Sequence, residues 1–252
     1  MASKETQTSD TEQERISKRM ARAGLCSRRD AERWIAAGRV KVNGKKLDSP
    51  ALNVGPDDKI LVDGKPIPGK PQTRLWMYHK PAGLVTTHAD EKNRKTVFDA
   101  LPPEMPRVIS IGRLDLTTEG LLLLTNNGEL SRHLEHPSTG WKRRYRVRVH
   151  GDVDPQALKD LKKGLTYEGV TYRSIDAKLE DDQSTGANTW VSVTLKEGKN
   201  REVRNIMQAL GVEVTRLIRV SYGPFQLGNL PVGDVVEVKR GVLKSSIGKD
   251  FT

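Results

Sequence analysis

Apolar positions near the start of the chain predict two short helices. They recur at helical spacing in two sets, which are Ile16, Met20 and Ala23, and then Ala31, Trp34 and Ile35. Gly24 and Gly38 are placed to end these helices, and Ser27 to begin the second one. Residues 1–13 are polar and carry no periodic pattern, so we expect a disordered tail there.

Strand patterns begin after the second helix. Val40-Lys41-Val42 alternates apolar and polar residues, and the pairs Asn43-Gly44 and Asp63-Gly64 are typical of tight turns. Residues 66–73 concentrate proline and glycine, which predicts a stiff linker too poor in amide donors to continue a sheet. The sequence therefore predicts a small domain of two helices and short strands at residues 14–65.

Beyond the linker, strand and helix patterns are interspersed. Strands are predicted at Leu75–His79, Val108–Ile111, Arg144–His150, Trp190–Leu195, Val214–Tyr222 and Val235–Lys239. Helices are predicted at Thr96–Leu101, Glu129–His133, Pro155–Lys162 and Arg201–Leu210. This mixture is typical of an α+β domain rather than of regular βαβ units. We place that domain at residues 74–243 and expect a C-terminal tail at 244–252.

Positive charge is concentrated near the start of the chain. The formal net charge is +11, and residues 15–46 hold eleven Lys and Arg against Asp30 and Glu32. A basic patch of this kind is typical of proteins that bind a polyanion, and phosphate binding is the interpretation that we favour. A solvated helix face of mixed charge is the alternative.

The remaining composition limits the possible chemistry. Cys26 is the only cysteine, so no intrachain disulfide can form, and we interpret it as a small buried residue in a protein of the reducing cytoplasm. The five histidines lack the spacing of metal ligands, so no metal site is expected. The chain has no run of 18 apolar residues, so we expect it neither to cross nor to enter a membrane.

One polar loop between apolar segments is the main candidate for catalysis. Residues 111–130 have the sequence IGRLDLTTEGLLLLTNNGEL, in which the loop with Asp115 precedes a hydrophobic strand. A carboxylate on such a loop is held rigidly while its oxygens stay accessible, as a nucleophile requires. The alternative is structural, because Asp often accepts hydrogen bonds from the amides of its own turn.

The basic N-terminal segment resembles a known RNA-binding module. The run RISKRMARAGLCSRRDAERWIAAGRVKVNGKKL is similar to the S4 domain, in which two helices present a basic face to folded RNA, and the similarity covers Arg15 to Val62. This resemblance implies that RNA is the polyanion. The candidate RNA contacts in this domain are Lys18, Arg19, Arg22, Arg28, Arg29 and Lys41.

The loop that contains Asp115 resembles the active-site motif of the bacterial ribosomal RNA pseudouridine synthases that carry an S4 domain. Segments YHKPAGLVTT, KRRYRVRV and EGKNREVRNIMQALGVEVTRLIRVSYGPFQLGNLPVGD agree with that family in the same order. The resemblance implies a catalytic domain with a mostly antiparallel mixed sheet flanked by helices. The pattern is most like the branch that acts on large-subunit (23S) RNA, and the small-subunit branch stays open.

The resemblance also implies site residues. Asp115 matches the family's nucleophile or charge stabiliser, Arg204 the ion-pair partner of that aspartate, and Tyr145 the residue that stacks on the base and takes part in proton transfer. Without the resemblance, Arg204 could be a surface arginine and Tyr145 a strand-packing residue. The further RNA-contact candidates of this domain are Arg113, Lys80, Arg143, Arg144, Lys199 and Arg201. The reaction has no net redox change, so no cofactor is expected, and we expect a monomer.

Two other functions stay open at this stage. A non-enzymatic RNA-binding or ribosome-assembly factor would keep the basic helices but would not need Asp115, Tyr145 and Arg204 together. A glycosidase-like hydrolase would cleave the base without rejoining it, and it would need a second acid, for which Glu119 is the candidate.

Overall fold

The computed structural model describes residues 13–180, 188–248 and 251, which divide into two compact units between Gln72 and Thr73. Each unit has a hydrophobic core of its own. The disordered tail predicted at residues 1–13 lies outside the described residues except for Gln13.

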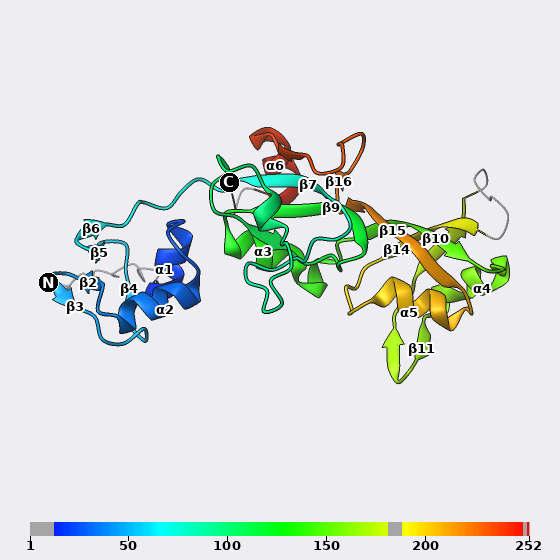
Figure 1. Cartoon of the computed structure of the whole chain (residues 1–252), viewed down its shortest axis with the longest axis horizontal. Helices are drawn as coiled ribbons and strands as arrows, with labels where there is room; N and C mark the ends of the chain where they lie inside the picture. Colours follow the sequence, from blue (N-terminus) through cyan, green and yellow to red (C-terminus); the bar gives the residue numbers. More distant parts are fainter. Residues whose placement is uncertain (1–12, 181–187, 249–250, 252) are drawn as a thin grey trace, which may run out of the picture. The chain divides into compact units, whose positions relative to one another are not determined.

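The N-terminal unit packs two helices against short strands (Figure 1). Its elements are β1 (Glu14–Arg15), α1 (Ile16–Arg22), α2 (Arg28–Ala36), β2 (Val40–Val42), β3 (Lys45–Lys46), β4 (Asn53–Val54), β5 (Ile60–Val62) and β6 (Lys65–Pro66). Helix α2 begins as predicted at Ser27, whose hydroxyl accepts the Asp30 amide at 3.0 Å. The core contains the apolar residues Ile16, Met20, Ala31 and Ile35 predicted for the helices.

The start of the predicted linker belongs to this unit. Pro66 pairs with Leu61, and the Ile67 amide donates to the Ile60 carbonyl at 3.1 Å. The side chain of Ile67 packs against the core. The prediction that residues 66–73 could not continue a sheet is therefore wrong for the first two positions. Strand β6 lies at a sheet edge, where a proline amide is not required.

The second unit is built on one mixed sheet. Its strands are β7 (Leu75–Lys80), β8 (Ile109–Ile111), β9 (Thr118–Thr125), β10 (Arg143–His150), β11 (Leu165–Tyr167), β12 (Val170–Tyr172), β13 (Asp176–Leu179), β14 (Asn188–Leu195), β15 (Glu213–Tyr222), β16 (Phe225–Gln226) and β17 (Val235–Glu237). Its α-helices are α3 (Gly128–Glu135), α4 (Pro155–Asp160), α5 (Glu202–Ala209) and α6 (Arg240–Ile247). Short 3-10 turns occupy Phe98–Ala100, Pro137–Thr139 and Leu161–Lys163.

The sheet has the order β13-β14-β10-β15-β9-β7-β17, with β8 beside β9 and β16 beside β15, and β11 and β12 form a separate hairpin. All pairs are antiparallel except β15 with β9. Each strand predicted in this domain is present, as are the helices predicted at residues 129–133, 155–162 and 201–210. The helix predicted at residues 96–101 is a single 3-10 turn.

The parallel pair joins two segments that are far apart in the sequence. Leu217 lies beside Thr118, and Arg219 beside Gly120. A Cβ atom on Gly120 would lie 2.3 Å from the Arg219 carbonyl oxygen, and Gly120 has a φ of +102°. Only glycine tolerates both conditions, so this residue permits the close approach of the two strands.

Helices cover the part of the sheet formed by β10, β14 and β15. Alternate residues of these strands, including Val147, Val193 and Leu217, share a core with Ile206 of α5 and Leu158 of α4. Figure 1 shows α5 running alongside β14 and β15. A second core lies between the sheet and helices α3 and α6. Helix α5 is therefore held against strands β10, β14 and β15.

The C-terminal tail predicted from residue 244 is wrong at its start. Helix α6 continues to Ile247, and Leu243, Ile247 and Phe251 pack against the core that includes Leu134 of α3. These three residues form only a short apolar pattern. Such a pattern does not by itself distinguish a packed helix from a tail. This unit therefore extends to at least Phe251.

Candidate active site

A cavity of about 530 Å³ opens in the second unit. It is bounded by the loop before β9, by strands β10 and β15, and by residues 195–203 leading into α5. Among the predicted site residues, it brings together Arg113, Asp115, Arg143, Tyr145, Lys199 and Arg201. The predicted residues thus contribute the half-buried Asp115 carboxylate, the Tyr145 ring and several cations to the lining.

Asp115 lies on a tightly held turn. The Thr118 amide donates to the Asp115 carbonyl at 3.0 Å, and the Gly83 amide donates to the Leu116 carbonyl at 2.8 Å. In the part of the chain that the structure describes, the half-buried Asp115 carboxylate accepts no hydrogen bond. The turn is therefore closed by backbone groups, which argues against the structural alternative in which the carboxylate closes it. Asp115 lines the cavity, and its carboxylate is not committed to the turn.

Lys80 holds this turn from inside. Its side chain is fully buried, and its Nζ donates to the carbonyls of Pro81, Asp115 and Thr118 at 2.9, 3.1 and 2.9 Å. Burial lowers the pKa of Lys80 to about 8, although the charges of Asp115 and Glu119 oppose this shift. Lys80 therefore does not present its ammonium group to a phosphate in this structure, because backbone carbonyls accept its hydrogen bonds.

Tyr145 forms part of the cavity wall. It lies on β10, directly opposite Val193 of β14 and Arg219 of β15. Its half-buried ring packs against both the core under α5 and the core that includes Leu122. The ring is thus held from both sides while its remaining surface is accessible from the cavity.

Arg204 lies on α5, close to the Asp115 turn. Its Nη2 donates to the Thr117 hydroxyl at 2.9 Å and its Nη1 to the Val214 carbonyl at 3.2 Å. Burial and the nearby Arg201 lower the pKa of Arg204, whereas the Asp115 charge raises it. Among the described residues, Arg204 forms no direct ion pair with Asp115. The predicted contact is replaced by a bond to the neighbouring Thr117, with a longer-range attraction between the two charges.

Arg143 fixes the opposite wall of the cavity. Its Nη1 donates to the carbonyls of Lys196 and Glu197 at 3.0 and 3.2 Å, and its Nη2 to the Tyr222 hydroxyl at 2.8 Å. The side chain of Arg143 is buried. The guanidinium group of Arg143 therefore bonds protein groups that shape the loop before α5, and its predicted RNA contact stays a prediction.

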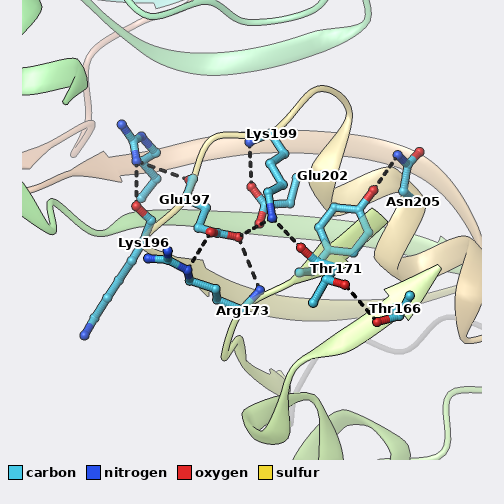
Figure 2. A network of polar contacts seen from close by, with 10 residues as sticks. Thr166, Thr171, Arg173, Lys196, Glu197, Lys199, Glu202 and Asn205 are labelled. Atoms are coloured by element: carbon cyan, nitrogen blue, oxygen red, sulfur yellow. Dashed lines mark hydrogen bonds and ion pairs between the residues drawn. The ribbon is translucent and has the colours of Figure 1, made fainter. Parts of the chain in front are cut away.

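The same loop is held by the polar network of Figure 2. The Lys199 amide donates to the buried Glu202 carboxylate at 2.9 Å, and the Lys199 ammonium lies 3.1 Å from Glu197. Burial raises the pKa of Glu202. Arg173 also pairs with Glu197, at 3.1 Å, and Asn205 donates to the Tyr172 hydroxyl. This network ties the β11–β12 hairpin to the loop that lines the cavity.

The remaining candidates in this unit are exposed. Arg113, Lys199 and Arg201 line the cavity and are exposed, and the Lys199 ammonium also contacts Glu197 and the Thr171 carbonyl. Arg144 lies outside the cavity in a separate groove with Arg146, and it donates to Gln226 at 2.9 Å. The cations at the cavity are therefore the better placed for a strand that enters it.

The six basic residues predicted to contact RNA in the N-terminal unit fall into two groups. Lys18, Arg19 and Arg22 converge on Glu14, with distances of 3.8 and 3.6 Å for the first two. The second group, which is exposed, comprises Arg28, Arg29 and Lys41. Part of the positive charge of α1 is therefore neutralised within the unit, and the exposed members of the predicted set lie on α2 and β2.

Two buried residues at the cavity were missed in the sequence. Arg219 and Glu202 are 2% and 4% exposed, respectively, and both line the cavity. Arg219 could have been found from its position in the predicted strand. It follows Leu217 by two residues, so both side chains lie on the same, buried side of β15. Glu202 carried no such signal, because a glutamate in the first turn of a helix is common on protein surfaces.

Two negative findings concern only residues 13–180, 188–248 and 251. They contain no cluster of three or more His, Cys, Asp or Glu side chains arranged to bind a metal ion. They also contain no helix that is long and apolar enough to span a bilayer.

The fold and this site define an RNA-modifying isomerase with an appended RNA-binding module. Residues 74–209 match the family model of RNA pseudouridylate synthase, and residues 14–60 match the S4 domain. The chain belongs to the RNA pseudouridylate synthase family, whose members isomerise uridine in RNA. Both predicted resemblances are thereby confirmed.

Known relatives resemble the chain over most of its length. An uncharacterized RNA pseudouridine synthase of Rickettsia bellii is 50% identical over 231 residues, covering 92% of this chain and 99% of that protein. Ribosomal large subunit pseudouridine synthase B of Salmonella typhimurium is 44% identical over 232 residues, covering 89% and 79%. The solved crystal structure of a pseudouridylate synthase superposes with a TM-score of 0.65 at 24% identity, covering 92% and 99%. The predicted fold is confirmed by this similarity.

Proposed function

We infer that the chain converts a specific uridine of the large-subunit ribosomal RNA to pseudouridine, with Asp115 as the residue on which the reaction depends. The observation that carries this inference is Asp115, which lines the cavity and whose carboxylate accepts no hydrogen bond from any described residue. Identity of 44% to a Salmonella protein named for the large ribosomal subunit supports the choice of RNA. The small-subunit RNA is the second candidate.

The chemistry conserves every atom of the substrate. The bond between N1 of uracil and C1′ of ribose breaks, and its electron pair stays on the base. The base turns, a bond forms between C5 and C1′, C5 loses a proton, and N1 gains one. Asp115 stabilises or captures the electron-poor C1′ while the base is detached. No cofactor takes part, because substrate and product have the same oxidation state.

The other residues support this step. Tyr145 packs against the base that has been turned out of its RNA helix, and its hydroxyl takes part in proton transfer. Arg204 attracts the Asp115 carboxylate through its charge and positions the turn through Thr117. Arg113, Lys199 and Arg201 contact phosphates at the mouth of the cavity.

A hydrolase is disfavoured because the second carboxylate is already engaged. Arg216 donates to both oxygens of Glu119, at 2.8 and 2.9 Å. These hydrogen bonds lower the pKa of Glu119, which makes it a poor proton donor for a leaving base. A hydrolytic mechanism would need an acid and an activated water at this place.

The cellular setting follows from the proposed substrate. We place the enzyme in the cytoplasm, where ribosomal RNA is made and assembled. We also propose that it acts as a monomer. Sedimentation of the pure protein tests the second statement.

The test is a map of pseudouridine in ribosomal RNA from cells whose only copy of the gene encodes Asp115→Asn. Asparagine has the size of aspartate but no charge, so the variant should fold with an unchanged melting temperature. We expect one large-subunit position to lose its modification completely. Loss at a small-subunit position would correct the proposed RNA, and modification of every site would refute the proposed function.

A further inference from the structure

Arg219 is a buried cation that none of the steps above uses. It lies on β15, lines the cavity, and is only 2% exposed. Withdrawing a guanidinium group from water is costly unless each of its donors finds a partner. A residue in this position therefore needs an explanation.

The protein provides hydrogen-bond partners for only part of this guanidinium group. Its Nε donates to the Leu121 carbonyl at 2.7 Å, and its Cζ lies 5.3 Å from the centre of the Tyr222 ring. Within the described residues, the buried Nη2 has no hydrogen-bond partner. Buried donors are almost always satisfied in native proteins, so an unsatisfied one beside a cavity points to a ligand.

The register of the sheet places Arg219 next to the strands that lead to the proposed reacting groups. Arg219 lies opposite Tyr145 on one side and beside Gly120 on the other. Tyr145 is the residue assigned to the base, and Gly120 follows the Asp115 turn in the chain. Arg219 thus lies in the sheet between the strand of the stacking residue and the strand that begins after the aspartate.

The ligand that best suits this position is a carbonyl oxygen of the base. Phosphates carry full charge and stay at the cavity mouth, where the exposed Arg113, Lys199 and Arg201 lie. A uracil that has been turned out of its helix enters more deeply and offers O2 and O4 as acceptors. When the bond from N1 to C1′ breaks, the electron pair left on the base is shared with both oxygens.

We propose that Arg219 donates a hydrogen bond from Nη2 to O2 or O4 of the target uracil and stabilises the detached base while it turns. This proposal rests on the proposed function and adds a residue that contacts the substrate. A preorganised donor of this kind stabilises its acceptor more strongly once the acceptor becomes negative. Arg219 should therefore affect the reaction rate rather than RNA affinity.

The experiment removes the proposed donor from the protein and weakens the proposed acceptor in the substrate. Full-length wild type, Arg219→Met and Arg219→Lys are assayed in single turnovers on an RNA fragment with uridine, 2-thiouridine or 4-thiouridine at the target position. We expect Arg219→Met to lower the rate at saturating RNA by about 100-fold, with RNA affinity unchanged. Sulfur is the weaker acceptor, so one thio substitution should slow the wild type by about tenfold and the methionine variant hardly at all.

Arg216→Gln is the matched control, because Arg216 lies on the same strand but pairs with Glu119. It should keep the wild-type thio effect. If Arg219→Met does not fold, the comparison is made with Arg219→Lys, which keeps the charge but loses the planar donor. Equal thio effects in wild type and in the folded Arg219 variant would overturn the proposal. A wild type that converts no uridine would instead refute the proposed function.

Discussion

At the scale of single residues, several long cations stabilise the site from inside. Lys80 donates to backbone carbonyls around the Asp115 turn, and Arg143 donates to those of Lys196 and Glu197. The sequence alone does not indicate this buried structural role, because lysine and arginine are rarely fully buried. The position of Asp115 itself was predictable, whereas the residues that hold its turn were not.

The shifted pKa of Lys80 predicts a pH dependence of stability. Burial lowers its pKa in the folded chain to about 8 from 10.5, so the unfolded chain binds more protons between these pH values. The free energy of unfolding contributed by Lys80 should therefore rise with pH in that window, by up to about 1.4 kcal/mol per pH unit. Urea unfolding of wild type and Lys80→Met at several pH values measures this difference.

Lys80→Met removes the titrating group, so its own pH dependence provides the baseline. Below pH 8 both chains should show parallel pH profiles, because Lys80 is then charged in the folded and unfolded wild type alike. Parallel profiles that persist above pH 8 would show that the ammonium group titrates normally and is not desolvated.

At the scale of secondary-structure elements, the parallel contact between β9 and β15 determines where the site forms. It brings the strand after Asp115 next to the strand of Arg219. The individual strands were predictable from their alternation of apolar and polar residues. Their parallel pairing was not, because β-pairing depends on contacts between distant segments that no local pattern encodes. The pairing also decides which arginine of β15 faces the cavity.

Gly120→Ala should disrupt this contact. The new methyl group would overlap the backbone of Arg219, and alanine is strained at a φ of +102°. We expect a loss of more than about 2 kcal/mol in the free energy of unfolding, measured by chemical denaturation. Gly241→Ala in α6 is the matched control, since no atom lies within 4 Å of its added methyl group. The control should be neutral or slightly stabilising, and equal losses in both variants would contradict the role given to Gly120.

At the scale of the whole molecule, the proposed function assigns RNA binding to both units and the reaction to the second unit. The N-terminal unit has its own core and exposes Arg28, Arg29 and Lys41. Its charge pattern and its S4 similarity were visible in the sequence. The convergence of three further cations on Glu14 was not, because Glu14 precedes α1 and only the folded turn brings it near them.

Joint replacement of Arg28 and Arg29 by glutamine should weaken RNA binding without slowing the chemistry. Each lost phosphate contact lowers the dependence of log affinity on log salt concentration by about 0.7 to 0.9. We therefore expect a higher KM, a smaller salt slope and an unchanged kcat. Fluorescence titration at several salt concentrations measures the slope. Arg94→Gln, which removes a surface cation paired with Asp90, serves as the control and should change none of these values.

The parallel contact between β9 and β15 also determines when a newly made chain becomes an enzyme. Arg219 and Leu121, which it bonds, are 98 positions apart, and the N-terminal part of a chain leaves the ribosome first. The Asp115 turn is therefore synthesised long before the strand that completes its cavity. A chain cut short ahead of β15 would retain the N-terminal unit and Asp115 but could not assemble the pocket in which that aspartate acts.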